Sequence, residues 1–149
     1  ELVTHNSGDK PVTVSQALHT YFQVGDISKV PVRGLEGADY IDKADDPARK
    51  AQVGPVRIGG EVDRIYTGVT GDLAIDDESL GRIIHITSKG CSTAVIWNPW
   101  AETAASMADL DDDDYKKMIC VETAYAGPET VERAAGSYYR LLAEYTIEN

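Results

Sequence analysis

Short runs of β-branched and aromatic residues, each ended by Gly, Pro, Asn or Asp, recur along almost the whole chain of 149 residues. Such runs favour pairing into sheets over helix, and their close spacing is typical of a sandwich or barrel of mostly antiparallel strands. We therefore predict a mostly β protein. The predicted strands cover residues 2–5, 12–15, 16–24, 30–33, 40–42, 56–58, 64–67, 72–75, 82–87, 93–97 and 118–125.

Only two segments compete as helices. Residues 101–110 follow Pro99 and are rich in Ala, Glu and Met, which predicts one or two helical turns. In residues 131–147, Ala134-Ala135 and residues 141–144 favour a helix by propensity. After Gly136, however, apolar and polar residues alternate as they do in a strand, so composition leaves both structures open.

The composition is that of one ordinary globular domain, with 42% hydrophobic and 26% charged residues. The 14 basic and 25 acidic residues leave a net charge of −11. This balance argues against nucleic acid and against anionic lipid as partners, because both are bound through clustered Lys and Arg. No stretch approaches the ~20 consecutive apolar residues that a membrane span needs.

Two cysteines, Cys91 and Cys120, are too few for a disulfide framework and too far apart for a Cys-x-x-Cys metal site. We expect them to be small buried hydrophobic residues of a protein in a reducing compartment, which is the cytoplasm. The chain opens on the strand-like Glu1-Leu2-Val3-Thr4 with no Met before it. We therefore expect it to be part of a longer protein.

The acidic run from Asp109 to Asp114 does not fit a calcium-binding loop. Counted from Asp109, the sixth and twelfth positions hold Asp114 and Cys120, where an EF-hand needs Gly and Glu. We predict a solvated acidic turn instead. The three histidines are scattered and the common nucleotide-binding and hydrolase motifs are absent from the sequence, so no metal or organic cofactor is predicted.

His19 and Glu122 are the two residues that stand out chemically. His19 is a titratable group in the apolar-aromatic run 17–22, which is followed by Asp26 at the end of the predicted strand. Glu122 is a carboxylate inside the apolar strand 118–125, where desolvation is costly unless it faces a cleft or a partner. Taken alone, such a His is more often a hydrogen-bonded structural residue, and such a Glu more often faces solvent in an alternating strand. Together, an acid and a base of this kind suit the opening of a sugar hemiacetal, although spacing cannot show that they meet.

At these residues the sequence resembles the hexose-6-phosphate mutarotases, or glucose-6-phosphate 1-epimerases, of the aldose 1-epimerase superfamily. Several motifs occur in the family's order and approximate spacing over nearly the whole chain. The matching stretches are residues 6–11, 17–22, 24–27, 34–35, 40–42, 61–66, 97–100, 107–109 and 120–124.

The resemblance implies a twisted antiparallel β-sandwich of the galactose-mutarotase type, with a sugar phosphate bound on a concave sheet face. It implies that His19 is the general acid on the ring oxygen and that Glu122 is the base on the anomeric hydroxyl. It also implies that Asp26 binds sugar hydroxyls and that Arg64 and Trp97 line the site. The expected activity is the interconversion of the α and β anomers of glucose 6-phosphate, with no cofactor.

The chain resembles only the C-terminal half of such an enzyme, so residues 1–149 are expected to be part of one larger domain. The family's upstream half supplies further strands, a second histidine and the arginines for the phosphate. The chain also has Ala135-Gly136 where the family has Pro-Gly before its last strand, and by the resemblance residues 138–147 are expected to be a strand. Two alternatives stay open: a non-catalytic carbohydrate-binding sandwich, presenting aromatic residues such as Trp97 and Trp100, and an inactive fragment of the epimerase.

Overall fold

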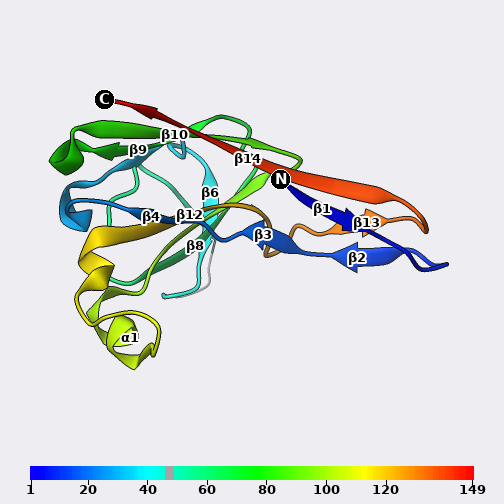
Figure 1. Cartoon of the computed structure of the whole chain (residues 1–149), viewed down its shortest axis with the longest axis horizontal. Coiled ribbons are helices and arrows are strands. Elements are labelled where there is room, and N and C mark those ends of the chain that lie inside the picture. The colour runs from blue at the N-terminus through cyan, green and yellow to red at the C-terminus, as the bar shows by residue number, and fades with distance from the viewer. Residues whose placement is uncertain (46–48) are drawn as a thin grey trace.

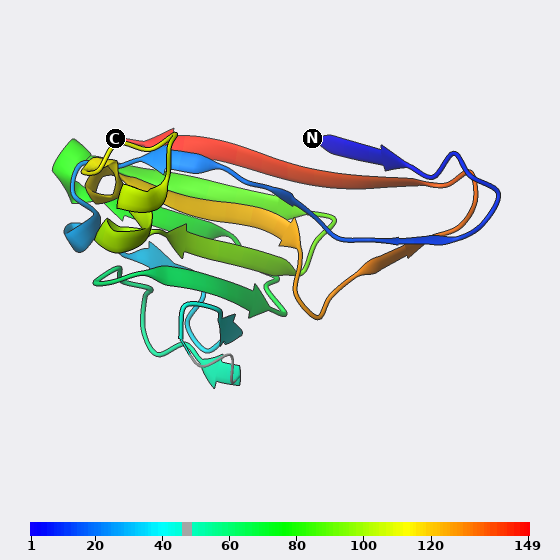
Figure 2. The ribbon, with the colours of Figure 1, turned by 90° about the horizontal axis from the view of Figure 1, so that it is seen from below.

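A computed structural model describes residues 1–45 and 49–149 and shows two antiparallel sheets packed face to face (Figures 1 and 2). In the described residues, the first sheet has the order β1 (Leu2–His5), β14 (Tyr138–Glu148), β10 (Arg82–Lys89), β9 (Leu73–Asp77) and β5 (Val32–Arg33). The second has the order β3 (Gln16–Leu18), β12 (Met118–Tyr125), β11 (Thr93–Asn98), β8 (Val62–Thr67), β6 (Asp39–Asp42) and β7 (Arg49–Ala51), and β4 (Tyr21–Gln23) also pairs with β12. The predicted antiparallel β-sandwich is confirmed.

Helices are short and lie at the ends of strands. The one α-helix of the described residues is α1 (Trp100–Ser106), and the 3-10 helices are η1 (Ile27–Lys29), η2 (Glu78–Leu80) and η3 (Asp114–Lys117). The predicted helix over residues 101–110 is thus confirmed only in its first part, and the acidic run 109–114 is largely exposed. Within the described residues, no helix has the length and apolar content needed to cross a lipid bilayer.

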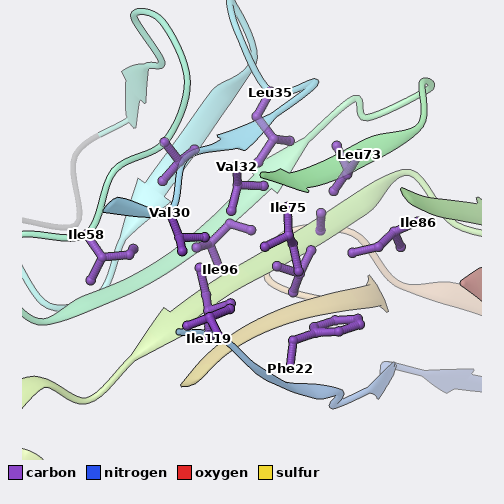
Figure 3. Close-up of a cluster of buried hydrophobic side chains, with 14 of the residues drawn as sticks. Phe22, Val30, Val32, Leu35, Ile58, Leu73, Ile75, Ile86, Ile96 and Ile119 are labelled. Atoms are coloured by element: carbon purple, nitrogen blue, oxygen red, sulfur yellow. The ribbon is translucent and has the colours of Figure 1, made fainter. Parts of the chain in front are cut away.

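The hydrophobic core fills the space between the two sheets (Figure 3). Ile75 and Ile86 come from the first sheet, and Ile96 and Ile119 come from the second; all four side chains are buried. Each of these strands directs alternate residues into the core, because side chains along a strand project to opposite faces. The residues between them therefore lie on the outer faces of the sandwich, and the outer face of the second sheet carries the candidate site.

Strand β14 resolves the ambiguity over residues 131–147. Its first part pairs with β1 and its second part pairs with β10, so its backbone groups are bonded across the sheet rather than within a helix. The preceding β13 (Val131–Arg133) pairs with β2 (Val12–Val14), and this ribbon projects from the sandwich beside β1 (Figure 2). The predicted strand over residues 138–147 is confirmed.

Two predicted strands differ from the structure. Residues 56–58 form only a single bridge, in which Val56 pairs with Val32 of the edge strand β5. Residues 16–24 do not form one continuous strand but two, β3 and β4, separated at His19 and Thr20. The Thr20 N–H donates to the Leu18 carbonyl oxygen at 3.0 Å, so the backbone turns tightly around His19.

Candidate active site

Glu122 projects from the middle of β12 onto the outer face of the second sheet. Ile119 and Val121, on the same strand, face the core, and alternation directs Cys120, Glu122 and Ala124 to the opposite side. The side chain of Glu122 is buried even so, with only 6% of its surface exposed. A buried carboxylate requires a partner, because burial without one is costly.

That partner is His19, whose Nε2 atom lies 3.2 Å from Oε1 of Glu122. Strands β3 and β4 pair with β12 in one continuous register, so the residues at the interruption, His19 and Thr20, lie opposite Glu122 and Val121. The expectation that His19 sits within a strand is wrong: it sits at the break, with 49% of its side chain exposed. The tight turn frees its backbone from the ladder and leaves the imidazole accessible to a ligand.

An aromatic group surrounds the imidazole. Tyr21 stacks on His19 with ring centroids 5.0 Å apart, and Trp97 meets both rings edge-on at 5.9 and 6.0 Å. Trp97 projects from β11 and pairs in register with Cys120 of β12. Aromatic rings offer flat apolar surfaces against which a sugar ring can pack, and Trp97 lies beside the His19–Glu122 pair.

The outer face of the second sheet is apolar from Glu122 across to β8, and we call this part of the face the apolar floor. Ile65 and Val95 lie in register with Glu122 across β8 and β11, and with Ala124 they form a small cluster separate from the main core. Asp63 lies in register with Trp97, on the same face, and its carboxylate is bonded to Lys43. The face therefore has the His19–Glu122 pair at one side, an apolar floor and the Lys43–Asp63 ion pair at the other side.

The surroundings of Glu122 raise the pKa of its carboxyl group from 4.5 to about 7. Burial is the main cause, the negative charge of Asp63 adds to it, and the positive charge of Lys43 opposes it. A carboxyl group with this pKa exists in both protonation states near neutral pH, which suits a group that must accept and return a proton. Burial also raises the pKa of the neighbouring Cys120 thiol, which keeps that sulfur protonated.

The structure does not bring Asp26 to this cluster. Asp26 caps η1, where its carboxylate accepts hydrogen bonds from the backbone and hydroxyl of Ser28 and pairs with Lys29 at 3.1 Å. The hydrogen bond from the Ser28 hydroxyl, followed by that from the Lys29 ammonium, lowers the pKa of its carboxyl group. These contacts give Asp26 a helix-capping role at the end of the sandwich.

Arg64 lies on the opposite face of the second sheet from Glu122. It pairs in register with Ile96 of the core, and its Nε atom lies 2.8 Å from Oδ2 of the buried Asp42. The guanidinium also lies 4.9 Å from the centre of the Tyr40 ring. The alternation of β8 thus directs Asp63, not its neighbour Arg64, to the sheet face that carries Glu122.

A family model for aldose 1-epimerase matches residues 1–146. The chain belongs to the aldose 1-epimerase family. This confirms the resemblance found in the sequence.

Relatives of this aldose 1-epimerase family member are longer than the chain. A protein of Cenchrus ciliaris is 39% identical over 120 residues, covering 80% of this chain and 36% of the relative. A protein of Escherichia coli is 42% identical over 113 residues, covering 75% and 38% respectively. Both are named as candidate glucose-6-phosphate 1-epimerases. The chain therefore spans well under half the length of these curated relatives.

Solved structures of the family share the fold. A candidate mutarotase of Salmonella typhimurium superimposes with a TM-score of 0.86 at 33% identity, covering 93% of this chain and 46% of that one. A galactose mutarotase-like protein of Clostridium acetobutylicum has a TM-score of 0.63 at 14% identity, which is a likeness of fold alone. The predicted mutarotase-like sandwich is confirmed.

Sequence reasoning did not single out Asp63, Lys43 or Tyr21 as members of the site. For Asp63, the alternation of side chains along β8 was the available signal. Asp63 and Ile65 lie on one face of the strand, and Arg64 lies on the opposite face. Tyr21 is two residues beyond His19 and so shares its face. Among the described residues, no group of three His, Cys, Asp or Glu side chains is placed to hold a metal ion.

Proposed function

We propose that this chain carries the proton-transfer pair of an enzyme that interconverts the anomers of glucose 6-phosphate. The observation that carries the proposal is the 3.2 Å separation between Nε2 of His19 and Oε1 of the buried Glu122. The ring oxygen and the anomeric hydroxyl of a pyranose are bonded to the same carbon. An acid and a base that serve both oxygens must therefore lie close together, as these two side chains do.

In the proposed reaction, Glu122 takes the proton of the anomeric hydroxyl while protonated His19 donates a proton to the ring oxygen. The bond between C1 and the ring oxygen breaks, and C1 becomes the carbonyl carbon of the open aldehyde. Rotation about the C1–C2 bond presents the other carbonyl face to the C5 hydroxyl. Closure with the two roles reversed forms the other anomer and returns both protons, so the pair ends in its starting state.

The phosphorylated substrate is part of the proposal, and its support comes from the names of the relatives. On the outer face of the second sheet, Lys43 is already paired with Asp63 at 2.7 Å, and the chain as a whole has a net charge of −11. A phosphate therefore needs cations from outside these residues. A plain aldose is the alternative substrate, and a comparison of exchange rates for glucose and glucose 6-phosphate separates the two.

We further propose that residues 1–149 are the C-terminal part of one larger domain whose other part closes an open side of the sandwich. Strands β3 and β4 end the second sheet, and the second part of β14 has only one described partner, β10. Both edges lie on the same side of the sandwich, because the hydroxyls of Thr20 and Tyr145 are 2.7 Å apart.

Apolar side chains are exposed along this open side. Ile147 and Tyr145 pair in register with the buried core residues Ile84 and Ile86, yet 58% and 40% of their surfaces are accessible. Edges of this kind favour pairing with additional strands. A strand added beside β3 and β4 would place further side chains next to His19, which is where a phosphate group could be held. This agrees with relatives that are more than twice as long as the matched segments.

Hydrogen exchange tests this second proposal. The outward-pointing backbone amides of Tyr21–Gln23 and of residues 142–148 are expected to exchange rapidly in the 149-residue chain and slowly in the full-length protein. Amides of the central strand β11 serve as the internal control, because they are protected in both proteins. Equal exchange at the two edges in both proteins would show that nothing pairs with them.

Anomer exchange measured by NMR tests the catalytic proposal. The full-length protein is expected to accelerate exchange between the α and β signals of glucose 6-phosphate, and the 149-residue chain is tested in parallel. Activity only in the full-length protein would identify the chain as an inactive part of the enzyme. Binding of the sugar phosphate by the full-length protein without any accelerated exchange would favour the non-catalytic carbohydrate-binding sandwich.

A further inference from the structure

Lys43 lies at the end of β6, directly across from Asp63. The Lys43 N–H donates to the Asp63 carbonyl oxygen at 2.7 Å, which continues the β6–β8 pairing by one residue. In this register, Lys43 projects to the same face as Asp63 and Trp97. Its Nζ atom lies 2.7 Å from Oδ2 of Asp63, so both the backbone and the side chains of these residues are joined.

The pairing matters because Asp63 places a second carboxylate on the face that holds Glu122. Two carboxylates on one face oppose each other's ionisation, and Asp63 raises the pKa of the Glu122 carboxyl group while Lys43 lowers it. Lys43 is not needed to fill the core, since 54% of its side chain is exposed. Its charge, rather than its packing, is what it contributes to this face.

We propose that Lys43 is a positioning residue of the active site: its ion pair with Asp63 fixes that carboxylate beside the apolar floor and offsets its charge, so that Glu122 is available as a base at neutral pH. The inference rests on the proposed function for its catalytic meaning. The effect of Lys43 on the ionisation of Glu122 involves only residues of this chain, so it can be measured without any enzymatic activity.

The charged and titratable groups that face Glu122 come from every neighbouring element. His19 comes from the turn between β3 and β4, Tyr21 from β4, Cys120 from β12 itself, Asp63 from β8 and Lys43 from the end of β6. Of these, Cys120 and Tyr21 have pKa values raised from their ordinary ranges, by burial above all, and stay neutral near pH 7. Lys43 is thus the fixed positive charge that counters Asp63 there.

The test is an NMR titration of the Glu122 carboxyl group in the 149-residue chain, which needs no enzymatic activity. Lys43→Met removes the charge and keeps the length of the side chain, and it is expected to move the Glu122 titration midpoint to higher pH. Lys43→Arg keeps the charge and is expected to retain the wild-type midpoint. Lys29→Met, which breaks a surface ion pair with Asp26 at the end of the sandwich, is the control and should leave Glu122 unchanged.

A double substitution separates the charge effect from a general disturbance. Asp63→Asn is expected to move the Glu122 midpoint to lower pH, and adding it to Lys43→Met should cancel the upward shift. An unchanged midpoint in a folded Lys43→Met chain would overturn the proposal. So would an upward shift that persists in the double variant, because that would mean the sheet had been distorted.

Kinetics in the full-length protein then measure the consequence for catalysis. Lys43→Met should lower kcat for anomer exchange at pH 7 by about two- to threefold and recover at higher pH, because an exposed charge is well screened. Lys43→Arg should restore the wild-type pH profile. If the titration shifts as expected but no exchange is detected in any protein, the proposed function fails and the pairing role of Lys43 remains.

Discussion

The imidazole of His19 and the carboxylate of Glu122 lie 3.2 Å apart although one is at a chain turn and the other is within a buried strand. At the turn, 49% of the His19 side chain is exposed, whereas only 6% of the Glu122 side chain is exposed within its strand. The imidazole is therefore open to solvent, while the carboxylate lies within the sheet.

Replacing Glu122 with Gln should remove the base while keeping the shape of the side chain. We expect anomer exchange by the full-length protein to fall by ~10²- to 10⁴-fold, the usual contribution of one acid–base group. Exchange of glucose 6-phosphate followed by NMR measures the effect. Glu144→Gln, on the exposed part of β14, is the matched control and should retain activity. Unaltered exchange in Glu122→Gln would remove Glu122 from the mechanism.

Trp97 should contribute to sugar binding and little to protein stability. Trp97→Leu removes the flat surface beside His19, and we expect KM to rise by about tenfold with a smaller change in kcat. Trp100 is the matched control because it packs against the main core and Tyr115 rather than against the site. Trp100→Phe should therefore lower the free energy of unfolding without raising KM, and the opposite pattern would contradict this assignment.

The stability of the chain should depend on pH through Glu122. Its carboxyl pKa is raised from 4.5 to about 7, so the folded state binds the proton more tightly than the unfolded state does. The resulting stabilisation is fully present below pH 4.5 and is lost as the pH rises through about 7. Glu122→Gln removes this dependence, and we expect it to be more stable than the wild-type chain at pH 8 by about 2–3 kcal/mol. Urea denaturation across this range measures the difference, which should vanish near pH 4.5.

Arg64 should act on stability rather than on substrate binding, because it faces away from Glu122. Arg64→Met leaves the buried carboxylate of Asp42 without its ion-pair partner, and we expect a loss of about 2–3 kcal/mol in the free energy of unfolding. Asp42→Asn in the same protein should recover part of that loss. KM for the sugar phosphate should stay within about twofold of the wild-type value in folded protein. A large rise in KM with unchanged stability would contradict this prediction and indicate that Arg64 binds the substrate.

Residues 118–125 show how far the sequence can lead. Their apolar character predicts a buried strand, and the carboxylate of Glu122 within it already indicates a residue that needs a partner. The identity of that partner depends on the register between β12 and the strands around His19. That register depends on pairing between segments that are far apart in the sequence, so residues 118–125 alone cannot predict it.

Arg64 and Asp26 show where motif reasoning differs from the structure. Both lie in stretches that match the family, but β8 directs Arg64 to the core side, and the start of η1 engages Asp26. Asp63 was adjacent to Arg64 in the same motif and lies on the site face instead. A motif indicates which segment contributes to a site, whereas the strand's alternation decides which of its residues does so.

The sequence by itself determined the class of fold, the family and the two residues with matching acid and base chemistry. The class of fold and the acid and base chemistry follow from local patterning and residue type, and the family follows from the order and spacing of its motifs. Only the tertiary structure decided that His19 turns out of its strand to meet Glu122, that burial and Asp63 raise the pKa of that carboxyl group, and that Lys43 opposes the rise. The distances between these side chains, their burial and the sheet face to which each one points arise only when separate strands pack together. They are therefore properties of the folded chain and cannot be predicted from local sequence.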